Sequence, residues 1–441
     1  MKAQPSRYVI VGPTTFRHPA GHPVRPVLHA ATARVYLVDP VTAGRLAGGA
    51  PLPEDAERAL RAAGLLVGPG VDEPAAVIAA GRRAVADTRE RRFVVMPTSW
   101  CNMSCSYCGQ AHVRGGTGPG HRDLLAARFA AAVDSGRYDT AHVSWFGAEP
   151  LAGYAVVRDL SRRFTAAADT AGVGYSAHMV TNGALLDARK IAALHVEDRV
   201  GYFEVTLDGP AAAHDASRPL KRGGGSFAHV VDVIGAALAE HGDLRWRIRT
   251  NVGVANAHLA DEFAATLAAA GLADPRVTLY SAPLHPWGND VSAAALDRAR
   301  MADTELAWLA AYARHGLTTW LLPGSPKPVV CVAVTPHAEV VAADGGVYSC
   351  TEQPLVPGFA DRRVATLATL GGGARPAGEF DDWADALEAD ETGCRGCRIL
   401  PLCGGACPKL WREGHVPCPP LKHNVAGRLD LYALSAGCTP L

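Results

Sequence analysis

Apolar and polar residues alternate in two rhythms through the middle of the chain. Short apolar runs typical of buried strands recur between longer stretches with apolar residues every three or four positions, typical of amphipathic helices. The first run, residues 91–99, precedes a helix-like stretch at 121–136. Further strand and helix pairs occupy 140–147 with 151–172, 175–183 with 186–197, 199–209 with 226–242, 245–254 with 258–272, and 276–284 with 292–316.

This rhythm predicts six βα units around a parallel sheet between residues 91 and 317. Six such units suggest a partial barrel, in which the loops after the strand C-termini hold the active site. Ser226 directly precedes the fourth helix and suits its N-cap. We therefore expect an α/β fold, a partial (β/α)6 barrel, with its chemistry on those loops.

The two flanks of the chain lack this rhythm. Residues from about 318 to 441 are rich in Pro, Gly and Cys, as expected where metal ligation replaces part of a hydrophobic core. Residues 1–90 predict a small α+β module, with strands at 7–12 and 33–39, short helices at 41–49 and 53–67, and a helical connector at 72–90. We predict three domains, with boundaries 1–90, 91–317 and 318–441.

Composition narrows the partners and the compartment. Lys plus Arg equals Asp plus Glu at 43 each, so no net field draws the molecule to nucleic acid or to an acidic membrane surface. The first residues lack the apolar run of a signal peptide, and no apolar stretch is long enough to span a membrane. We predict a cytoplasmic protein. There, its 11 cysteines suit metal ligation better than disulfides.

Three cysteines stand close together just after the first predicted strand. Cys101, Cys105 and Cys108 have the spacing Cys-x3-Cys-x2-Cys. They supply one thiolate fewer than a tetrahedral zinc site or a fully ligated iron–sulfur cubane requires. The pattern therefore indicates an open metal position, with a zinc site or an incidental loop as the alternative.

The loop resembles the cluster motif of the radical SAM enzymes. The resemblance implies a [4Fe–4S] cluster on Cys101, Cys105 and Cys108, whose fourth iron binds the methionine end of S-adenosylmethionine (SAM). It also assigns Tyr107, the aromatic residue before the last cysteine, to the adenine of SAM. An ordinary packing role for Tyr107 is the alternative.

Two later stretches also fall where the family contacts SAM. The segment FGAEP at 146–150 resembles the family's GGEP, so Gly147 and Glu149 are implied to meet the amino group of SAM. Ala148 replaces the usual second glycine, which puts the local backbone in doubt but leaves the role of Glu149.

The stretches VTNG and VTLDG end the third and fourth predicted strands. By resemblance their residues Asn182, Thr206 and Asp208 contact the ribose and carboxylate of SAM, with turn stabilisation as the alternative. The run that follows, at 210–227, resembles the DG-P, HD, RP and G-SF pattern of the peptide- and protein-modifying members. Its Arg218 could fix a carboxylate bidentately or only order the loop.

Seven cysteines near the C-terminus resemble the SPASM domain. Taken without the upstream triplet, part of this pattern would also fit a four-cysteine zinc ribbon. The resemblance implies two auxiliary [4Fe–4S] clusters, hence three clusters in the chain. The outer one would use Cys394, Cys397, Cys403 and Cys418, and the inner one Cys331, Cys350 and Cys407.

One expected ligand of the inner cluster is missing. Fully ligated relatives have a further cysteine shortly before the first of the seven, and this chain has none before Cys331. Either one iron is open and could bind a substrate thiolate, or the distant Cys438 closes the cluster. The alternative for Cys438 is a free thiol in the tail.

Taken together, the resemblance implies an oxidoreductase in which a reductant such as flavodoxin or ferredoxin drives reductive cleavage of SAM to methionine and a 5′-deoxyadenosyl radical. We expect a maturase that forms a thioether or carbon–carbon crosslink in a ribosomally made precursor peptide, with the N-terminal module as a winged-helix-like domain that binds its leader as an extra strand. A helical cap over the barrel is the alternative for that module.

Three other functions are considered. The related anaerobic sulfatase-maturing enzymes carry an aspartate base right after the second SPASM cysteine, where this chain has Thr351, so sulfatase maturation is disfavoured. A radical SAM dehydrogenase acting on a small molecule and a zinc or iron–sulfur protein without turnover remain alternatives. The sequence indicates no catalytic base.

Overall fold

The computed structural model describes residues 3–371 and 373–441. It consists of two compact units, each built from segments that are separated in the sequence. The larger unit comprises Asp87–Thr319 and Val332–Asp381. The smaller unit comprises Met1–Ala86, Trp320–Cys331 and Asp382–Leu441.

The larger unit is an α/β structure on a 10-stranded sheet in the order β13-β12-β11-β10-β9-β8-β7-β14-β15-β16. The predicted run of parallel strands is confirmed, because each strand from β7 to β12 pairs in parallel with the next. These strands are β7 (Glu90–Val95), β8 (Thr140–Trp145), β9 (Gly174–Thr181), β10 (Val200–Thr206), β11 (Arg245–Val252) and β12 (Val277–Pro283).

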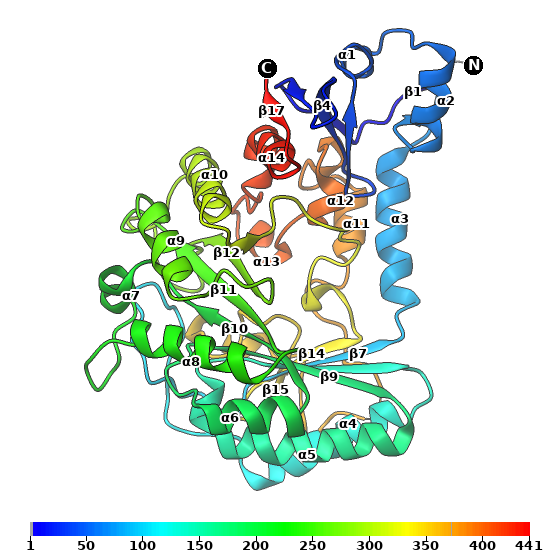
Figure 1. Cartoon of the computed structure of the whole chain (residues 1–441). Helices are drawn as coiled ribbons and strands as arrows, with labels where there is room; N and C mark the ends of the chain where they lie inside the picture. Colours follow the sequence, from blue (N-terminus) through cyan, green and yellow to red (C-terminus); the bar gives the residue numbers. More distant parts are fainter. Residues whose placement is uncertain (1–2, 372) are drawn as a thin grey trace. The chain divides into compact units, whose positions relative to one another are not determined.

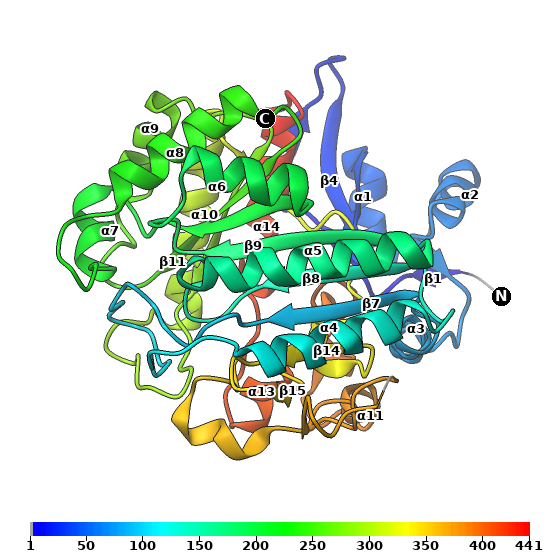
Figure 2. The same ribbon diagram turned by 90° about the horizontal axis from the view of Figure 1, so that it is seen from below.

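Helices connect these strands and cover one face of the sheet. Figures 1 and 2 show α4 and α5 lying along β7 and β8 on that face. The helices of this unit are α4 (Pro119–Val133), α5 (Tyr154–Ala171), α6 (Ala188–Ala192), α7 (Ala211–Ser217), α8 (Phe227–Glu240), α9 (Ala260–Ala269) and α10 (Arg298–Arg314). Single turns lie at η1 (Pro150–Gly153), η2 (Ala193–Glu197), η3 (Val332–Val334) and η4 (Pro357–Arg362).

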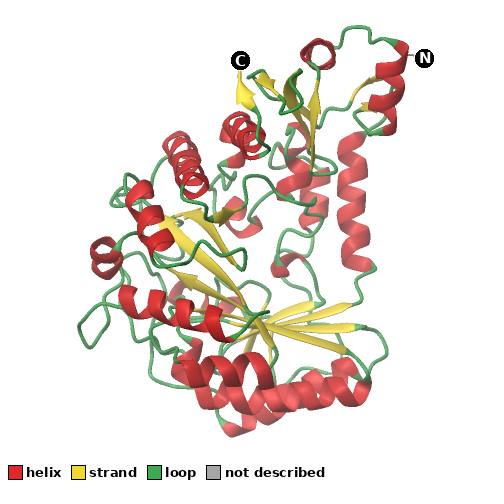
Figure 3. Ribbon diagram, viewed as in Figure 1, coloured by secondary structure: helices red, strands yellow, loops and turns green. Residues whose placement is uncertain are grey.

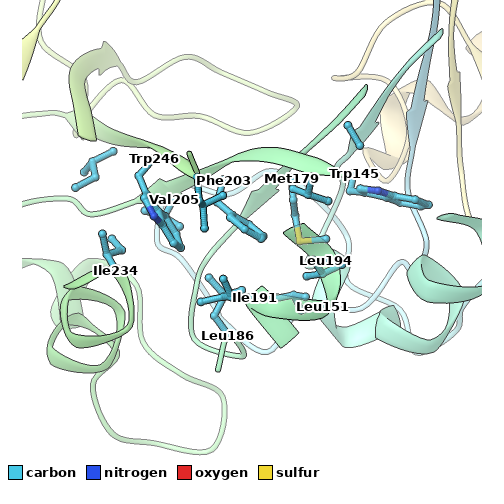
Figure 4. Close-up of a cluster of buried hydrophobic side chains, with 14 of the residues drawn as sticks. Trp145, Leu151, Met179, Leu186, Ile191, Leu194, Phe203, Val205, Ile234 and Trp246 are labelled. Atoms are coloured by element: carbon cyan, nitrogen blue, oxygen red, sulfur yellow. The ribbon is translucent and has the colours of Figure 1, made fainter. Parts of the chain in front are cut away.

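Side-chain alternation along the strands separates an apolar face from a polar one. In β8, Ala141, Val143 and Trp145 are fully buried, whereas His142 and Ser144 between them are only partly buried. Figure 4 shows Trp145, Met179, Phe203 and Trp246 gathered in the apolar core beneath the helices. On the opposite face, His142 Nε2 of β8 lies 2.7 Å from His178 Nδ1 of β9, while Val94 of β7 and Val340 of β14 form a smaller apolar cluster.

Part of the predicted cysteine-rich domain adds strands to the sheet of the larger unit and does not form a separate domain. Strand β14 (Ala338–Val341) pairs in parallel with β7, and β15 (Gly346–Tyr348) and β16 (Ala365–Thr366) follow antiparallel, while β13 (Thr318–Thr319) extends the other edge. Pairing of this kind covers the otherwise open edge of β7. Buried Glu339 ties β14 to β7 and α4, because it accepts from Arg91 at 2.5 Å and Arg128 at 2.6 Å.

The smaller unit begins with an antiparallel sheet. Its core contains the buried residues Val9, Val27, Leu46 and Leu60. The first 90 residues form β1 (Gln4–Pro5), β2 (Val9–Val11), β3 (Phe16–Arg17), β4 (Pro23–His29), β5 (Arg34–Val38), α1 (Pro40–Gly48), α2 (Glu54–Ala62), β6 (Leu66–Val67) and α3 (Glu73–Ala86). The predicted strands are present and so are the helices, except that the helix expected over 53–67 ends at Ala62 and Leu66–Val67 form strand β6. The winged-helix interpretation stays a prediction.

The cysteine-rich segment of the smaller unit consists of short helices. They are α11 (Trp383–Glu388), η5 (Cys394–Gly396), α12 (Leu400–Cys403), α13 (Pro408–Arg412) and α14 (Leu421–Ser435), followed by β17 (Thr439–Pro440) (Figure 3). Strand β17 pairs with β3 of the N-terminal sheet.

Ion pairs also join the first and last segments of the chain. Arg395 contacts Asp72 at 2.9 Å, and Arg82 contacts Asp385 at 2.6 Å. Residues predicted as separate terminal domains thus share one compact unit. No helix within residues 3–371 and 373–441 has the length and apolar character needed to cross a membrane.

Candidate functional site

The cysteine loop follows β7, at the carboxyl end of the parallel sheet. A second loop, after α7, pairs with it, because Met103 and Leu220 form an antiparallel bridge. The N–H of Ser104 also donates to the carbonyl of Pro219 at 3.0 Å, and that of Ser106 to Ser217 at 3.0 Å. The second loop therefore holds the cysteine loop over the ends of the strands.

A pocket of about 220 Å³ lies at this end of the sheet. Its lining draws on the carboxyl-terminal ends of β9, β10, β11 and β12 and on the loops after β7, β8 and β12, as expected for a parallel α/β sheet. Of the residues predicted from the sequence, it includes Cys101, Cys105, Tyr107, Cys108, Gly147, Asn182, Thr206 and Arg218. The structure thus brings the three thiols together with most of the residues predicted to contact SAM.

The surroundings of the three thiols suit metal ligation. Burial raises the pKa of Cys101 to about 11 and also raises the pKa of Cys105 and Cys108, while the positive charge of Arg218 opposes each shift. The N–H of Met103 donates to Cys101 Sγ at 3.4 Å. Ligation requires the thiolate form. A buried cation and an N–H donor beside the sulfur atoms favour that form, so the donor set fits an iron–sulfur cluster.

The phenol of Tyr107 points into a buried network of polar side chains. Its hydroxyl donates to Asp208 Oδ2 at 2.5 Å and accepts from Asn251 Nδ2 at 3.0 Å and from Arg218. Its backbone carbonyl accepts from Asn289 Nδ2 at 3.0 Å. The side chain therefore orders Asp208 and Arg218, and the role of Tyr107 toward adenine stays a prediction.

Arg218 is the buried cation of the site. It is 7% exposed and lies 3.8 Å from Asp208. Its Nε is buried and has no hydrogen-bond partner among the described residues. Because Arg218 lines the pocket and its planar guanidinium carries only donors, it can donate hydrogen bonds to a carboxylate.

Glu149 lies directly behind the pocket wall. The residue is fully buried, and its carboxylate accepts from the N–H of Leu151 at 2.9 Å, the N–H of Asn182 at 2.8 Å and the hydroxyl of Thr181 at 2.7 Å. Burial raises the pKa of Glu149, and these hydrogen bonds oppose the shift. In this structure Glu149 holds the strand ends whose residues Thr181 and Asn182 line the pocket.

Gly147 has a conformation that its position requires. Its φ is +111°, and a Cβ there would lie 2.9 Å from Met96 Cγ. Glycine is therefore needed for the chain to pass this close to Met96, the residue that follows β7.

The residues of the HD and G-SF motifs form hydrogen bonds with one another. His214 accepts from the N–H of Asp208 at 3.2 Å through Nδ1, and its Nε2 lies 3.0 Å from Ser226 Oγ. Asp215 Oδ1 accepts from the N–H of Ser226 at 2.8 Å and of Phe227 at 3.1 Å. Ser226 occupies the N-cap position of α8 as expected, but its side chain makes no capping hydrogen bond, because its hydroxyl lies against His214 and the carboxylate of Asp215 caps α8 instead.

Two asparagines of the site were missed from the sequence. Asn251 donates its N–H to Asp208 Oδ1 at 2.8 Å, and Asn256 donates to the Asp208 carbonyl at 2.8 Å. Asn251 lies at the end of β11, so its place after a parallel strand was the available signal.

The opposite wall of the pocket is polar and aromatic. Arg249, His285, Trp287 and Glu352 line it, and Arg249 Nε donates to Asn251 Oδ1 at 2.9 Å. His285 and Trp287 follow β12, so the loop after that strand also lines the pocket. Asp290, in the same loop, is not in the lining and accepts from the N–H of Ser292 at 2.8 Å.

A second cysteine group lies in the smaller unit. Burial raises the pKa of Cys403 to about 11, and the charges of Cys397, Cys394 and Cys418 add to that shift. Lys422 Nζ donates to Cys418 Sγ at 3.4 Å. The four thiols assigned to the outer cluster are thus within electrostatic reach of one another, beside a cation, and this donor set fits a fully ligated cluster.

The residues assigned to the inner cluster do not all belong to one unit. Cys331 and Cys407 belong to the smaller unit, and Cys350 belongs to the larger one. Cys438 is 2% exposed and packs with Phe16, Val24 and Ala433. Its surroundings are therefore those of an apolar core residue.

Within the residues that the structure describes, no group of three or more His, Cys, Asp or Glu side chains is arranged to hold a metal ion. A cubane has a different requirement, because it binds each of its cysteine ligands at a different iron.

Comparison with known proteins identifies the barrel segment. Residues 95–243 match the family model described as the radical SAM superfamily. No curated protein matches the chain.

Comparison of structures finds similar chains, and those of anSMEcpe share its fold. The structure "Native anSMEcpe with bound AdoMet and Cp18Cys peptide" is 14% identical, with a TM-score of 0.59 over 78% of this chain and 97% of that chain. A second anSMEcpe structure, with AdoMet and Kp18Cys peptide, is 16% identical over the same shares, with a TM-score of 0.59. Streptococcus suis SuiB bound to precursor peptide SuiA is 11% identical over 94% of this chain and 98% of that chain, with a TM-score of 0.47.

Proposed function

Because residues 95–243 make this chain a member of the radical SAM superfamily, we propose that it is a maturase that forms a thioether or carbon–carbon crosslink in a ribosomally made precursor peptide. One observation carries the radical SAM part of the proposal. The thiols of Cys101, Cys105 and Cys108 line a single pocket together with the buried Arg218, at the carboxyl end of the sheet.

The residues of this pocket have distinct tasks in the proposal. Cys101, Cys105 and Cys108 hold a [4Fe–4S] cluster, while Arg218 and Asn182 offer N–H donors to the carboxylate and ribose of SAM. A cluster and SAM held there would supply, once a reductant has delivered an electron, a radical able to take one hydrogen atom from an unactivated carbon. The protein orients the reacting groups and excludes water around them.

A peptide substrate is supported by two features. The anSMEcpe structure of the same fold holds AdoMet and a peptide. In the N-terminal sheet, β5 pairs with β4, and no other pairing of β5 is found among the described strands. An edge strand of this kind can accept an extended leader peptide through main-chain hydrogen bonds.

Crosslinking removes two hydrogens from the peptide. One leaves as the hydrogen atom taken by the radical, and the other leaves as a proton together with an electron, for which the proposed auxiliary clusters are the acceptor. Glu352 lines the pocket and accepts from Thr351 Oγ1 at 3.2 Å. Thr351 itself cannot act as a base, but the next residue carries a carboxylate. We assign to Glu352 the role of the base that accepts this proton.

The test uses the full chain purified and reconstituted without air. With SAM, dithionite and a short peptide encoded beside its gene, the enzyme should yield 5′-deoxyadenosine and a peptide lighter by two hydrogens. Glu352→Gln should retain deoxyadenosine formation and lower crosslinked product about 10²-fold or more. Deoxyadenosine without a change in peptide mass, for any neighbouring peptide, would contradict the maturase proposal and favour a small-molecule substrate.

A further inference from the structure

The outer surface of the cysteine loop carries a concentrated positive charge. Arg114, Lys221 and Arg222, here called the basic rim, are all exposed and come from the two paired loops. Neither residues 99–120 nor residues 216–231 contain a single Asp or Glu. In a chain with equal numbers of acidic and basic residues, this local separation of charge sets the rim apart.

The basic rim is held in place by an aromatic ring. Lys221 Nζ lies 4.0 Å and Arg114 Cζ 4.6 Å from the centre of the Trp100 ring. The N–H of Lys221 also donates to the Asn102 carbonyl at 2.9 Å. Cation–π contacts of this kind limit the motion of both side chains and keep their charge beside the cysteine loop.

The thiols lie directly beneath this surface. Ser104 and Ser106, on either side of Cys105, are exposed, and Cys105 itself is partly exposed. Next to them, Val113 is 64% exposed and offers an apolar contact within the basic surface. Lys221 Nζ lies 3.5 Å from His112 Nδ1, and His112 Nε2 lies 3.9 Å from Cys108 Sγ, so a protein bound to the basic rim would stand close to the cysteine loop.

We propose that the basic rim is the docking site for an acidic one-electron carrier protein. This inference rests on the proposed function, because only a redox cluster at Cys101, Cys105 and Cys108 gives a carrier something to reduce. The carrier loses one electron and the group held by the three thiols gains it, once for each SAM cleaved. Complementary charge steers such an encounter and makes it sensitive to salt.

The test compares two reductants. In Lys221→Glu/Arg222→Glu, deoxyadenosine formation driven by a flavodoxin and its reductase should fall at least about tenfold, because reversed charge repels the acidic surface. Formation driven by dithionite, which needs no docking, should stay at the wild-type rate. The matched control Arg162→Glu/Arg189→Glu changes the net charge equally on exposed positions of α5 and α6 and should leave both rates unchanged.

A binding measurement gives a second readout without turnover. Wild-type protein should bind oxidised flavodoxin with an affinity that falls as salt rises, and the rim variant should lose at least about tenfold in affinity. Equal binding and equal flavodoxin-driven rates in the rim variant would overturn the docking site. Wild-type protein that fails to cleave SAM even with dithionite would instead overturn the proposed function.

Discussion

The cysteine loop of the larger unit and the four-cysteine group of the smaller unit differ in what surrounds their thiols. The loop offers three thiols at the wall of a pocket of about 220 Å³, beside the buried Arg218. The other group offers four thiols beside the exposed Lys422. Since a cubane has four irons, three thiols leave one iron for another ligand, whereas four close the cluster. The missing ligand and the adjoining pocket, rather than thiol chemistry itself, distinguish a reactive site from an electron carrier.

The largest expected difference between the two cysteine groups is in iron content and SAM cleavage when cysteines are removed from one group at a time. Wild-type protein should bind about twelve irons in three cubanes. Replacing Cys101, Cys105 and Cys108 by alanine should abolish SAM cleavage and leave about eight irons. Cys403→Ala should instead retain SAM cleavage while losing the outer cluster.

Iron analysis and deoxyadenosine assays on anaerobically prepared protein measure both effects. Retained SAM cleavage in the triple variant would refute the assignment of the loop. Colourless wild-type protein containing zinc would do so as well.

The second largest expected difference is in how much the cation beside each cysteine group contributes to the free energy of unfolding. Arg218→Met leaves buried Asp208 without the positive charge of Arg218 and should destabilise the protein by about 3–5 kcal/mol. Lys422→Met removes an exposed cation and should change stability by less than about 1 kcal/mol. Urea unfolding followed by tryptophan fluorescence measures both. Equal effects would show that Arg218 does not act as a buried charge.

The loop beside the pocket should also respond to pH. Burial lowers the pKa of His214 to about 3 from an ordinary 6.5, and its Nδ1 already accepts the N–H of Asp208. The folded state thus binds fewer protons than the unfolded state below about pH 6.5, so stability is intact above that pH and is lost as the pH falls. The loss should approach about 1.4 kcal/mol per pH unit.

Thermal unfolding between pH 7.5 and 5.5 tests this prediction. The variant His214→Gln should unfold at a lower temperature at pH 7.5 and show a weaker decline as the pH falls. The same decline in both proteins would assign the effect to another group.

Cys438 should give the smallest effect. Because it packs among apolar side chains, Cys438→Ala should cost about 1 kcal/mol and leave the iron content unchanged. Iron analysis decides this, with Cys403→Ala as the matched variant that loses iron. Loss of iron in Cys438→Ala would instead make Cys438 the closing ligand of the inner cluster.

Several parts of the fold and site could be predicted from the sequence, because they depend on local pattern. Strands β7 to β12 follow from apolar runs, and the pocket residues Cys105, Asn182 and Thr206 follow from the resemblance to the radical SAM motifs. Short-range periodicity suffices for the strands, and the rule that parallel strands place their ends together explains why the motif residues lie near one another.

Other parts depend on contacts between distant residues, which no local pattern contains. The pairing of β14 with β7 depends on the buried Glu339 meeting Arg91 and Arg128, more than 200 positions earlier in the chain. The joining of the N-terminal sheet to the cysteine-rich segment depends on pairs such as Asp72 with Arg395. The capping of α8 by Asp215 was missed for a related reason, because a nearer hydroxyl suited the same task.

The central claim is that one iron at the Cys101, Cys105 and Cys108 loop lacks a protein ligand and binds SAM. Electron paramagnetic resonance of the dithionite-reduced protein, with and without SAM, tests it most directly. The signal of one cluster should change when SAM is added, and that change should be absent from the variant lacking all three thiols. A wild-type spectrum that SAM leaves unaltered would contradict the claim.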